Sequence, residues 1–193
     1  MAGGDWIEPV ISLLPAEKFY GEDLRSGQIH LVDTRGNRNL FNENGIHVGS
    51  EQTCPDIRFG TGDNRKVEYY CLNTAENQGF DRDFHLYELE WTPDSITLKI
   101  DDEGVFSTPF PRPNMYKLWS GGREIPNPWE VEGTENPKLA PFDKEFYLAI
   151  GVKVGGISGF FSDDYSNRPY SKPWKNTDTI NKSLQSFWVA GEH

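Results

Sequence analysis

The sequence lacks several features that mark whole classes of protein. No apolar run approaches the roughly 20 residues of a transmembrane helix. There is no Gly-rich phosphate loop, no zinc-ligand spacing and no internal repeat, so neither a nucleotide site nor a zinc finger is indicated. Residues 1–6 lack the basic and apolar regions of a signal peptide. Either the protein is cytosolic or this chain is not the whole precursor.

Positive charge is also scarce. The chain has 19 Lys and Arg residues against 30 Asp and Glu residues, which gives a formal net charge of -11. Such a charge disfavours non-specific binding to nucleic acid or to an anionic membrane surface. We therefore expect neither as a partner. A neutral partner such as a polysaccharide is compatible with this charge but is not implied by it.

What the chain does contain is typical of an all-β protein. Hydrophobic residues make up 36% of the 193 residues, which is enough for a buried core. The 26 aromatic residues (6 Trp, 8 Tyr and 12 Phe) occur together with 19 Gly and 13 Pro. This combination favours a single loop-rich domain over residues 1–193. Aromatic rings also stack on sugars, but core packing accounts for most of them.

Alternation of apolar and polar residues predicts several short strands. A long loop over 108–141 contains Trp119 and Trp129, and a single helical turn is expected near 182–188. Since no longer helix is indicated, two packed antiparallel sheets are the expected architecture. The predicted strands cover 4–15, 28–34, 45–49, 56–59, 84–91, 96–100 and 145–154.

The strand at 28–34 is unusual because polar residues occupy positions that a buried strand fills with apolar ones. In a regular strand Gln28, His30 and Val32 face one side. Asp33 joins Gln28 and His30 only if one residue is bulged out, and bulges often lie next to active sites. This polar face is either the floor of a binding groove or an ordinary wet surface, and the strand alone leaves both open.

Two covalent features are suggested without being decided. Cys54 and Cys71 are the only cysteines, and they flank a polar loop. A disulfide between them would contribute roughly 3 kcal/mol in the chain-entropy model. Two unpaired thiols are equally compatible with the sequence. Asn181 begins an Asn-Lys-Ser glycosylation sequon, although such triplets often arise by chance.

Four phrases, in this order, carry a family resemblance: 4–15 (GDWIEPVISLLP), 26–37 (SGQIHLVDTRGN), 84–93 (FHLYELEWTP), and NPW at 127–129 followed by PFDKEFYL at 141–148 and VGG at 154–156. Together they resemble the laminarinase-like glycoside hydrolases of family sixteen, and within them the invertebrate β-1,3-glucan recognition proteins, also called Gram-negative bacteria-binding proteins. The resemblance implies a concanavalin-like β-jelly-roll sandwich with a glucan groove across one concave sheet. It implies no cofactor and no metal.

The resemblance also implies that catalysis is lost. Catalytic members carry Glu-x-Asp-x-x-Glu on the strand that matches 28–33, with the first Glu as nucleophile and the last as acid/base. Here these positions read Gln28, His30 and Asp33. A retaining mechanism needs two carboxyl groups about 5–5.5 Å apart. An amide nucleophile and a shortened acid do not meet that need, so we expect binding without hydrolysis. A weak hydrolase that uses Asp33, and an interaction protein without glycan binding, are the alternatives.

The matching positions suggest which side chains line the groove. His85 is either a core histidine whose hydrogen bonds are made within the protein or a residue of the groove. The domain is expected to be incomplete at both ends, which would leave a sheet edge and part of a core face uncovered. By resemblance the protein is extracellular and binds β-1,3-glucan or another microbial polysaccharide, and immune-cascade proteins are its further partners. The expected groove residues are Trp6, Gln28, His30, Asp33, Arg35, His85, Trp119, Trp129 and Lys153.

Overall fold

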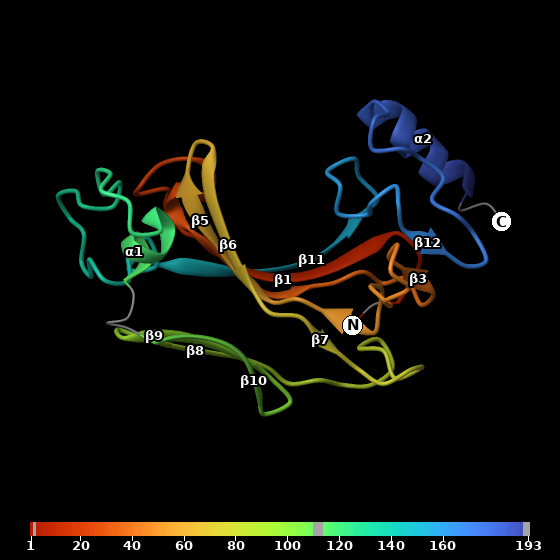
Figure 1. Ribbon diagram of the computed structural model, residues 1–193, viewed down its shortest axis with the longest axis horizontal. Coiled ribbons are helices and arrows are strands. Elements are labelled where there is room, and N and C mark those ends of the chain that lie inside the picture. Colours follow the sequence, from red (N-terminus) through yellow and green to blue (C-terminus); the bar gives the residue numbers. More distant parts are fainter. Residues whose placement is uncertain (2, 110–113, 191–193) are drawn as a thin grey trace.

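The computed structural model describes residues 1, 3–109 and 114–190. Its main element is a five-stranded antiparallel sheet. Figure 1 shows a three-stranded sheet as a separate layer on one side of it, with α1 and α2 at opposite ends of the molecule. The five strands are, in spatial order, β11 (Phe146–Val154), β1 (Ile7–Pro15), β2 (Gln28–Asp33), β5 (Asp56–Thr61) and β6 (Asn64–Tyr69). The predicted all-β jelly-roll class is confirmed by this arrangement together with the structural relatives described below.

The remaining elements are shorter. The second sheet has the order β10 (Glu103–Pro109), β9 (Ser95–Ile100) and β8 (Tyr87–Thr92). Two further pairs join β12 (Ser166–Asn167) to β3 (Leu40–Phe41) and β4 (Gln52–Thr53) to β7 (Leu72–Asn73). The helices are the 3-10 turn η1 (Asp23–Ser26), α1 (Met115–Ser120) and α2 (Ile180–Ala190). In the described part of the chain, neither α-helix has the length and apolar character needed to cross a membrane.

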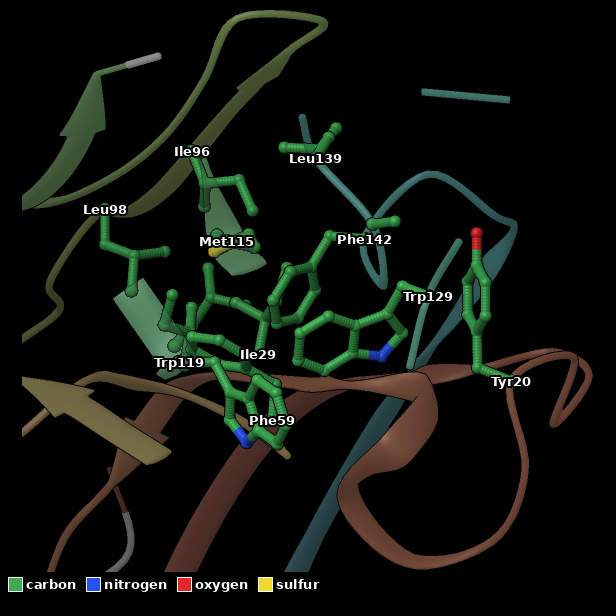
Figure 2. Packing of buried hydrophobic residues seen from close by; sticks show 13 residues of the cluster. Tyr20, Ile29, Phe59, Ile96, Leu98, Met115, Trp119, Trp129, Leu139 and Phe142 are labelled. Atoms are coloured by element: carbon green, nitrogen blue, oxygen red, sulfur yellow. The ribbon is translucent and has the colours of Figure 1, made fainter. Parts of the chain in front are cut away.

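The core between the two sheets follows from the alternation in the sequence. Ile96 and Leu98 on β9 are buried and face Ile29, Ile57 and Phe59 of the large sheet. The segment that contains α1 and the following loop closes the open end of this core with large apolar side chains, most of them aromatic. Figure 2 shows these side chains gathered in one cluster with Ile29 and Phe59 of the large sheet. They include Met115, Trp119, Trp129, Leu139 and Phe142.

A bulge in β2 decides which residues share the polar face of the large sheet. Ile11 pairs with Val32, but the next residue, Ser12, pairs with His30, so Leu31 is the extra residue. Leu31 is buried in the core. Beyond the bulge Asp33 lies opposite Val10 and therefore faces the same side as His30. The sequence-based condition for bringing Asp33 onto the polar face is thus met.

Several sequence-based boundaries are wrong. The strand expected at 45–49 is absent, and an isolated bridge between Phe41 and His47 takes its place. Part of the loop expected at 108–141 forms α1, which is capped by the Asn114 side chain accepting from Lys117 N. The expected single turn near 182–188 is an 11-residue helix, α2. Apolar residues do recur at helical spacing in this segment (Ile180, Leu184, Phe187 and Trp188), so the local pattern allowed a longer helix than the single turn expected. Phe187 packs this helix against a second core.

Cys54 and Cys71 form a disulfide, which decides between the two alternatives left open by the sequence. The bridge spans a sequence separation of 17 residues. It joins the segment before β5 to the segment after β6 and so ties the two ends of that hairpin together.

Strand β11 forms one edge of the large sheet, since β1 is its only neighbour among the described strands. Its apolar stripe, which continues the core face of β1, remains exposed: Leu148 is 59% exposed and Ile150 is 73% exposed. One sheet edge and part of the face that continues the core are thus uncovered among the described residues. An exposed apolar edge of this length is a surface that favours association.

Truncating a core tryptophan should cost far more stability than truncating a surface one. Trp129 is 1% exposed and donates from Nε1 to Arg25 O at 2.7 Å. We expect Trp129→Ala to lower the free energy of unfolding by about 3–5 kcal/mol, because it leaves a large cavity and an unpaired carbonyl. Trp188→Ala is the matched control, since Trp188 is 70% exposed and should cost little. Urea denaturation followed by circular dichroism measures both, and equal losses would contradict this account of the core.

Candidate functional site

The polar face of the large sheet holds a cavity of about 280 Å³. Four strands contribute to it, and its lining combines polar side chains with apolar ones such as Val10 and Leu14. Ala149 and Gly151 on β11 leave room above β1. The lining residues are Val10, Ser12, Leu14, Gln28, His30, Arg58, Ala149, Ile150, Gly151 and Lys153.

An ion network lies along one side of this cavity. Arg58 on β5 donates from Nε to both carboxylate oxygens of Asp56, at 2.9 and 3.0 Å. Its Nη2 donates to Asp56 at 2.6 Å and also to Asp33. His30 Nδ1 lies 3.1 Å from Asp56 Oδ1 and 3.7 Å from Asp33 Oδ2. Arg58 and Asp56 share a face because they are two residues apart on β5.

The network fixes the charge state of Asp33. Burial by itself raises the pKa of this carboxyl group, but the neighbouring His30 and the Arg58 guanidinium outweigh burial and lower the pKa to about 2. Burial lowers the pKa of His30, and the adjacent Asp33 and Asp56 carboxylates more than reverse this, so the pKa of His30 is raised overall. Asp33 is therefore an ionised, ion-paired group near neutral pH, which is the wrong state for a general acid.

A second ion pair borders the cavity on the β11 side. Lys153 donates to Glu8, and the two residues are register partners on β11 and β1. Glu8 is 6% exposed, whereas the Lys153 side chain is 55% exposed. Burial raises the pKa of Glu8, the nearby Asp33 carboxyl adds to this, and the ammonium of Lys153 opposes it. Both ion pairs place their cations toward the cavity and their carboxylates beneath it.

The structure brings together four of the residues suggested by the sequence, namely Gln28, His30, Asp33 and Lys153. Gln28, His30 and Lys153 line the cavity directly. Asp33 lies on the same face and reaches the cavity through its contacts with His30 and Arg58. We therefore interpret the polar strand as the floor of a cavity rather than as an ordinary solvent-exposed face.

The three tryptophans suggested as groove residues are elsewhere, and that prediction was wrong. Trp119 and Trp129 are 6% and 1% exposed in the core between the sheets. Trp6 is 4% exposed and packs against Phe161 and Trp174 in a second core. A ring that is fully packed on both faces has no surface on which a sugar can stack. All three tryptophans therefore fill a hydrophobic core, which is the role expected of most aromatic residues in the chain.

Arg35 and His85 are also not groove residues. Arg35 donates to the carbonyl oxygens of Phe160 and Val48 and lies over the Phe160 ring at 4.3 Å, so it ties loops together. Burial lowers its pKa. His85 Nδ1 lies 2.6 Å from Asp101 Oδ2, just before the three-stranded sheet, and its ring packs near Phe80. These contacts favour the interpretation of His85 as a packed structural histidine.

Sequence reasoning did not identify Arg58, Asp56 or Glu8 as residues near the site. Asp-Ile-Arg at 56–58 does alternate in the pattern of a strand with one polar face. However, the pairing of β5 beside β2 is a long-range contact that no local pattern contains. The signal that was available is the charge at alternate positions of a strand that is otherwise apolar.

Comparison with curated proteins gives relatives along nearly the whole chain. No family model matches it. It is 33% identical over 196 residues to a β-1,3-glucan-binding protein of Penaeus monodon, a match that covers 98% of this chain and 48% of that protein. A β-1,3-glucan-binding protein of Tenebrio molitor is 32% identical, with 97% and 35% covered. Gram-negative bacteria-binding protein 1 of Drosophila melanogaster is 31% identical, with 90% and 32% covered. The chain thus spans about half or less of these relatives.

Solved structures agree on the fold. The laminarinase from Rhodothermus marinus superposes with a TM-score of 0.54 at 21% identity, covering 82% of this chain and 53% of that one. The endo-β-1,3-glucanase from Pyrococcus furiosus gives a TM-score of 0.54 at 18% identity, covering 81% and 48%. At these identities the likeness establishes a shared jelly-roll architecture and nothing about activity.

Removing the central cation of the network should destabilise the fold. Arg58→Gln leaves Asp33 and Asp56 buried without their guanidinium partner, and breaking such a pair is costly. Because the Arg58 side chain is 29% exposed, we expect a loss of about 2 kcal/mol in the free energy of unfolding. Arg65→Gln serves as the control, since its ion pair with Asp23 is long and exposed. Urea denaturation at neutral pH measures both variants, and an equal effect would contradict a central role for Arg58.

Proposed function

Because this chain is homologous over nearly its whole length to β-1,3-glucan-binding proteins of Penaeus monodon and Tenebrio molitor, we propose that it recognises β-1,3-glucan without cleaving it. The cavity on the polar face of the large sheet is the proposed binding site. Its biological role would be recognition of microbial surfaces in innate immunity, with immune-cascade proteins as further partners.

One observation carries the non-catalytic part of the proposal. The strand that matches the catalytic strand of laminarinase-like hydrolases presents Gln28 in place of the nucleophile. An amide cannot act as an anionic nucleophile toward an oxocarbenium-like centre. The remaining carboxylate, Asp33, is paired with Arg58 and stays ionised, so it lacks the proton that an acid catalyst donates.

The same residues suit recognition of a sugar. Gln28 and Ser12 offer both donors and acceptors for hydroxyl groups, and Arg58 and Lys153 add donors at either side. Buried polar groups held in place by a sheet lose little freedom on binding, which favours affinity. Gly151 leaves open space above the sheet, because a Cβ there would meet only Val10 Cγ1 at 4.0 Å.

The disulfide supports an extracellular location. Cys54–Cys71 is the kind of bridge that persists in oxidising compartments and is rare in the cytosol. Asn181, the first residue of the sequon, is exposed near the start of α2, so a glycan there would meet no core packing. An extracellular location is in turn what recognition of a microbial polysaccharide requires.

Filling the cavity should abolish glucan binding while leaving the fold intact. We expect Gly151→Phe to lower retention on insoluble β-1,3-glucan beads at least tenfold, because the ring would occupy the space above β1. Val152→Phe is the matched control: it adds a ring to the next residue of the same strand but on the opposite face. A pull-down at physiological salt measures both, with circular dichroism to confirm folding. Equal retention of the two variants would place glucan binding elsewhere, and no retention of the unmodified chain would refute the proposal.

Restoring the matching carboxylates should not create a hydrolase. We expect the triple variant Gln28→Glu, His30→Asp and Asp33→Glu to release no reducing sugar from laminarin, because Arg58 still neutralises the acid position and the core-face edge at β11 stays uncovered. A colorimetric reducing-sugar assay against the unmodified chain measures this. Hydrolysis by the unmodified chain that disappears in Asp33→Ala would instead support the weak-hydrolase alternative.

A further inference from the structure

The side chains of His30, Asp33 and Asp56 form a compact group of possible metal ligands. Each offers one ligand atom, and these atoms lie within 4.8 Å of one another. The group is deeply buried, since the three residues are 5%, 7% and 3% exposed. Among the described residues it is the one such group that contains three candidate ligands. One nitrogen and two carboxylate oxygens make a donor set that suits zinc and similar divalent ions.

The spacing of the atoms matches zinc coordination. In a tetrahedral site, ligand atoms that each lie about 2.0–2.1 Å from zinc are about 3.3 Å apart. His30 Nδ1 lies 3.1 Å from Asp56 Oδ1 and 3.7 Å from Asp33 Oδ2, which brackets that value. Both histidine–carboxylate distances therefore lie within a few tenths of an ångström of that spacing, and all three ligand atoms lie within 4.8 Å of one another.

Two atoms of the group have no hydrogen-bond partner. His30 Nδ1 and Asp33 Oδ1 are buried and unpaired among the described residues, although His30 is within ion-pair distance of both carboxylates. Buried polar atoms are nearly always paired, so an unpaired nitrogen that points between two carboxylates requires an explanation. A metal ion accounts for this arrangement, because it would take the place of the proton between Nδ1 and the two carboxylates.

Arg58 is the competing cation. It currently neutralises Asp33 and Asp56 from the cavity side. Its side chain is 29% exposed and borders the cavity of about 280 Å³, so the guanidinium has space to swing away while the ligands stay on their strands. His30 also lines that cavity, which gives an ion a route in from solvent and leaves one coordination position facing the groove.

We propose that His30, Asp33 and Asp56 bind one zinc-class divalent ion at the floor of the groove, in exchange for the Arg58 guanidinium. The three ligands come from β2 on both sides of its bulge and from the adjacent β5, so the site depends on the same register that creates the polar face. The open position of the ion faces the space in which a sugar hydroxyl would lie. This site does not depend on the proposed glucan recognition.

Calorimetric titration of the chelator-treated chain with zinc chloride tests the site directly. We expect one equivalent to bind and the affinity to fall at least tenfold in His30→Ala and in Asp56→Asn. His85→Ala is the matched control, since His85 forms the other close His–Asp pair at 2.6 Å from Asp101 but belongs to no three-ligand group among the described residues. No binding, or equal binding by His30→Ala and the unmodified chain, overturns the proposal.

A second measurement separates a metal site from a purely structural ion network. Zinc should raise the melting temperature of Arg58→Gln more than that of the unmodified chain, because the ion supplies the positive charge that the variant lacks. Magnesium at the same concentration is the control, since it prefers all-oxygen ligands. If His30→Ala does not fold, this rescue and the visible absorption of the cobalt-substituted unmodified chain decide the matter. Equal melting shifts in the two chains, or cobalt spectra of a purely hydrated ion, overturn the proposal.

Discussion

The bulge at Leu31 is the constraint on which the site depends. One extra residue in β2 turns Leu31 into the core and places Gln28, His30 and Asp33 on the same side of the sheet. Without it, Asp33 would face the apolar layer that β9 contributes, where an ionised carboxylate is very costly. The bulge therefore keeps apolar side chains in the core and polar side chains on the opposite face. It also aligns β2 with β5 so that Arg58 reaches both Asp33 and Asp56.

Ion pairs dominate the polar face of the large sheet. The carboxylates Glu8, Asp33 and Asp56 are all nearly buried, and each lies beneath or beside a cation that borders the cavity. Such pairs are poor sources of net stability compared with apolar packing, but removal of either partner is costly. Their arrangement fixes side chains that would otherwise sample many rotamers. A preorganised surface of donors favours recognition of hydroxyl groups, whereas proton transfer requires a carboxyl group that is free to change its charge.

The edge strand β11 has two faces of different character. β11 exposes Leu148 and Ile150 on the side that continues the core face, and the chain spans only about half of the curated relatives that it matches. The groove lies on the opposite face of the same strand, where Gly151 and Lys153 line the cavity. The two faces of β11 thus differ in character, although Ile150 also borders the cavity.

Local sequence determined much of this protein. Alternation at 96–100 and 145–154 predicted strands, and the four ordered phrases predicted the all-β jelly-roll fold. It did not locate the tryptophans, because a ring that fills a core and a ring that binds a sugar have the same local pattern, and only packing partners separate Trp129 from a groove residue. The ion network could not be predicted from local sequence either. Arg58 meets Asp33 through strand pairing across 25 residues of chain, and that pairing is set by burial of the whole sheet rather than by any neighbour in sequence.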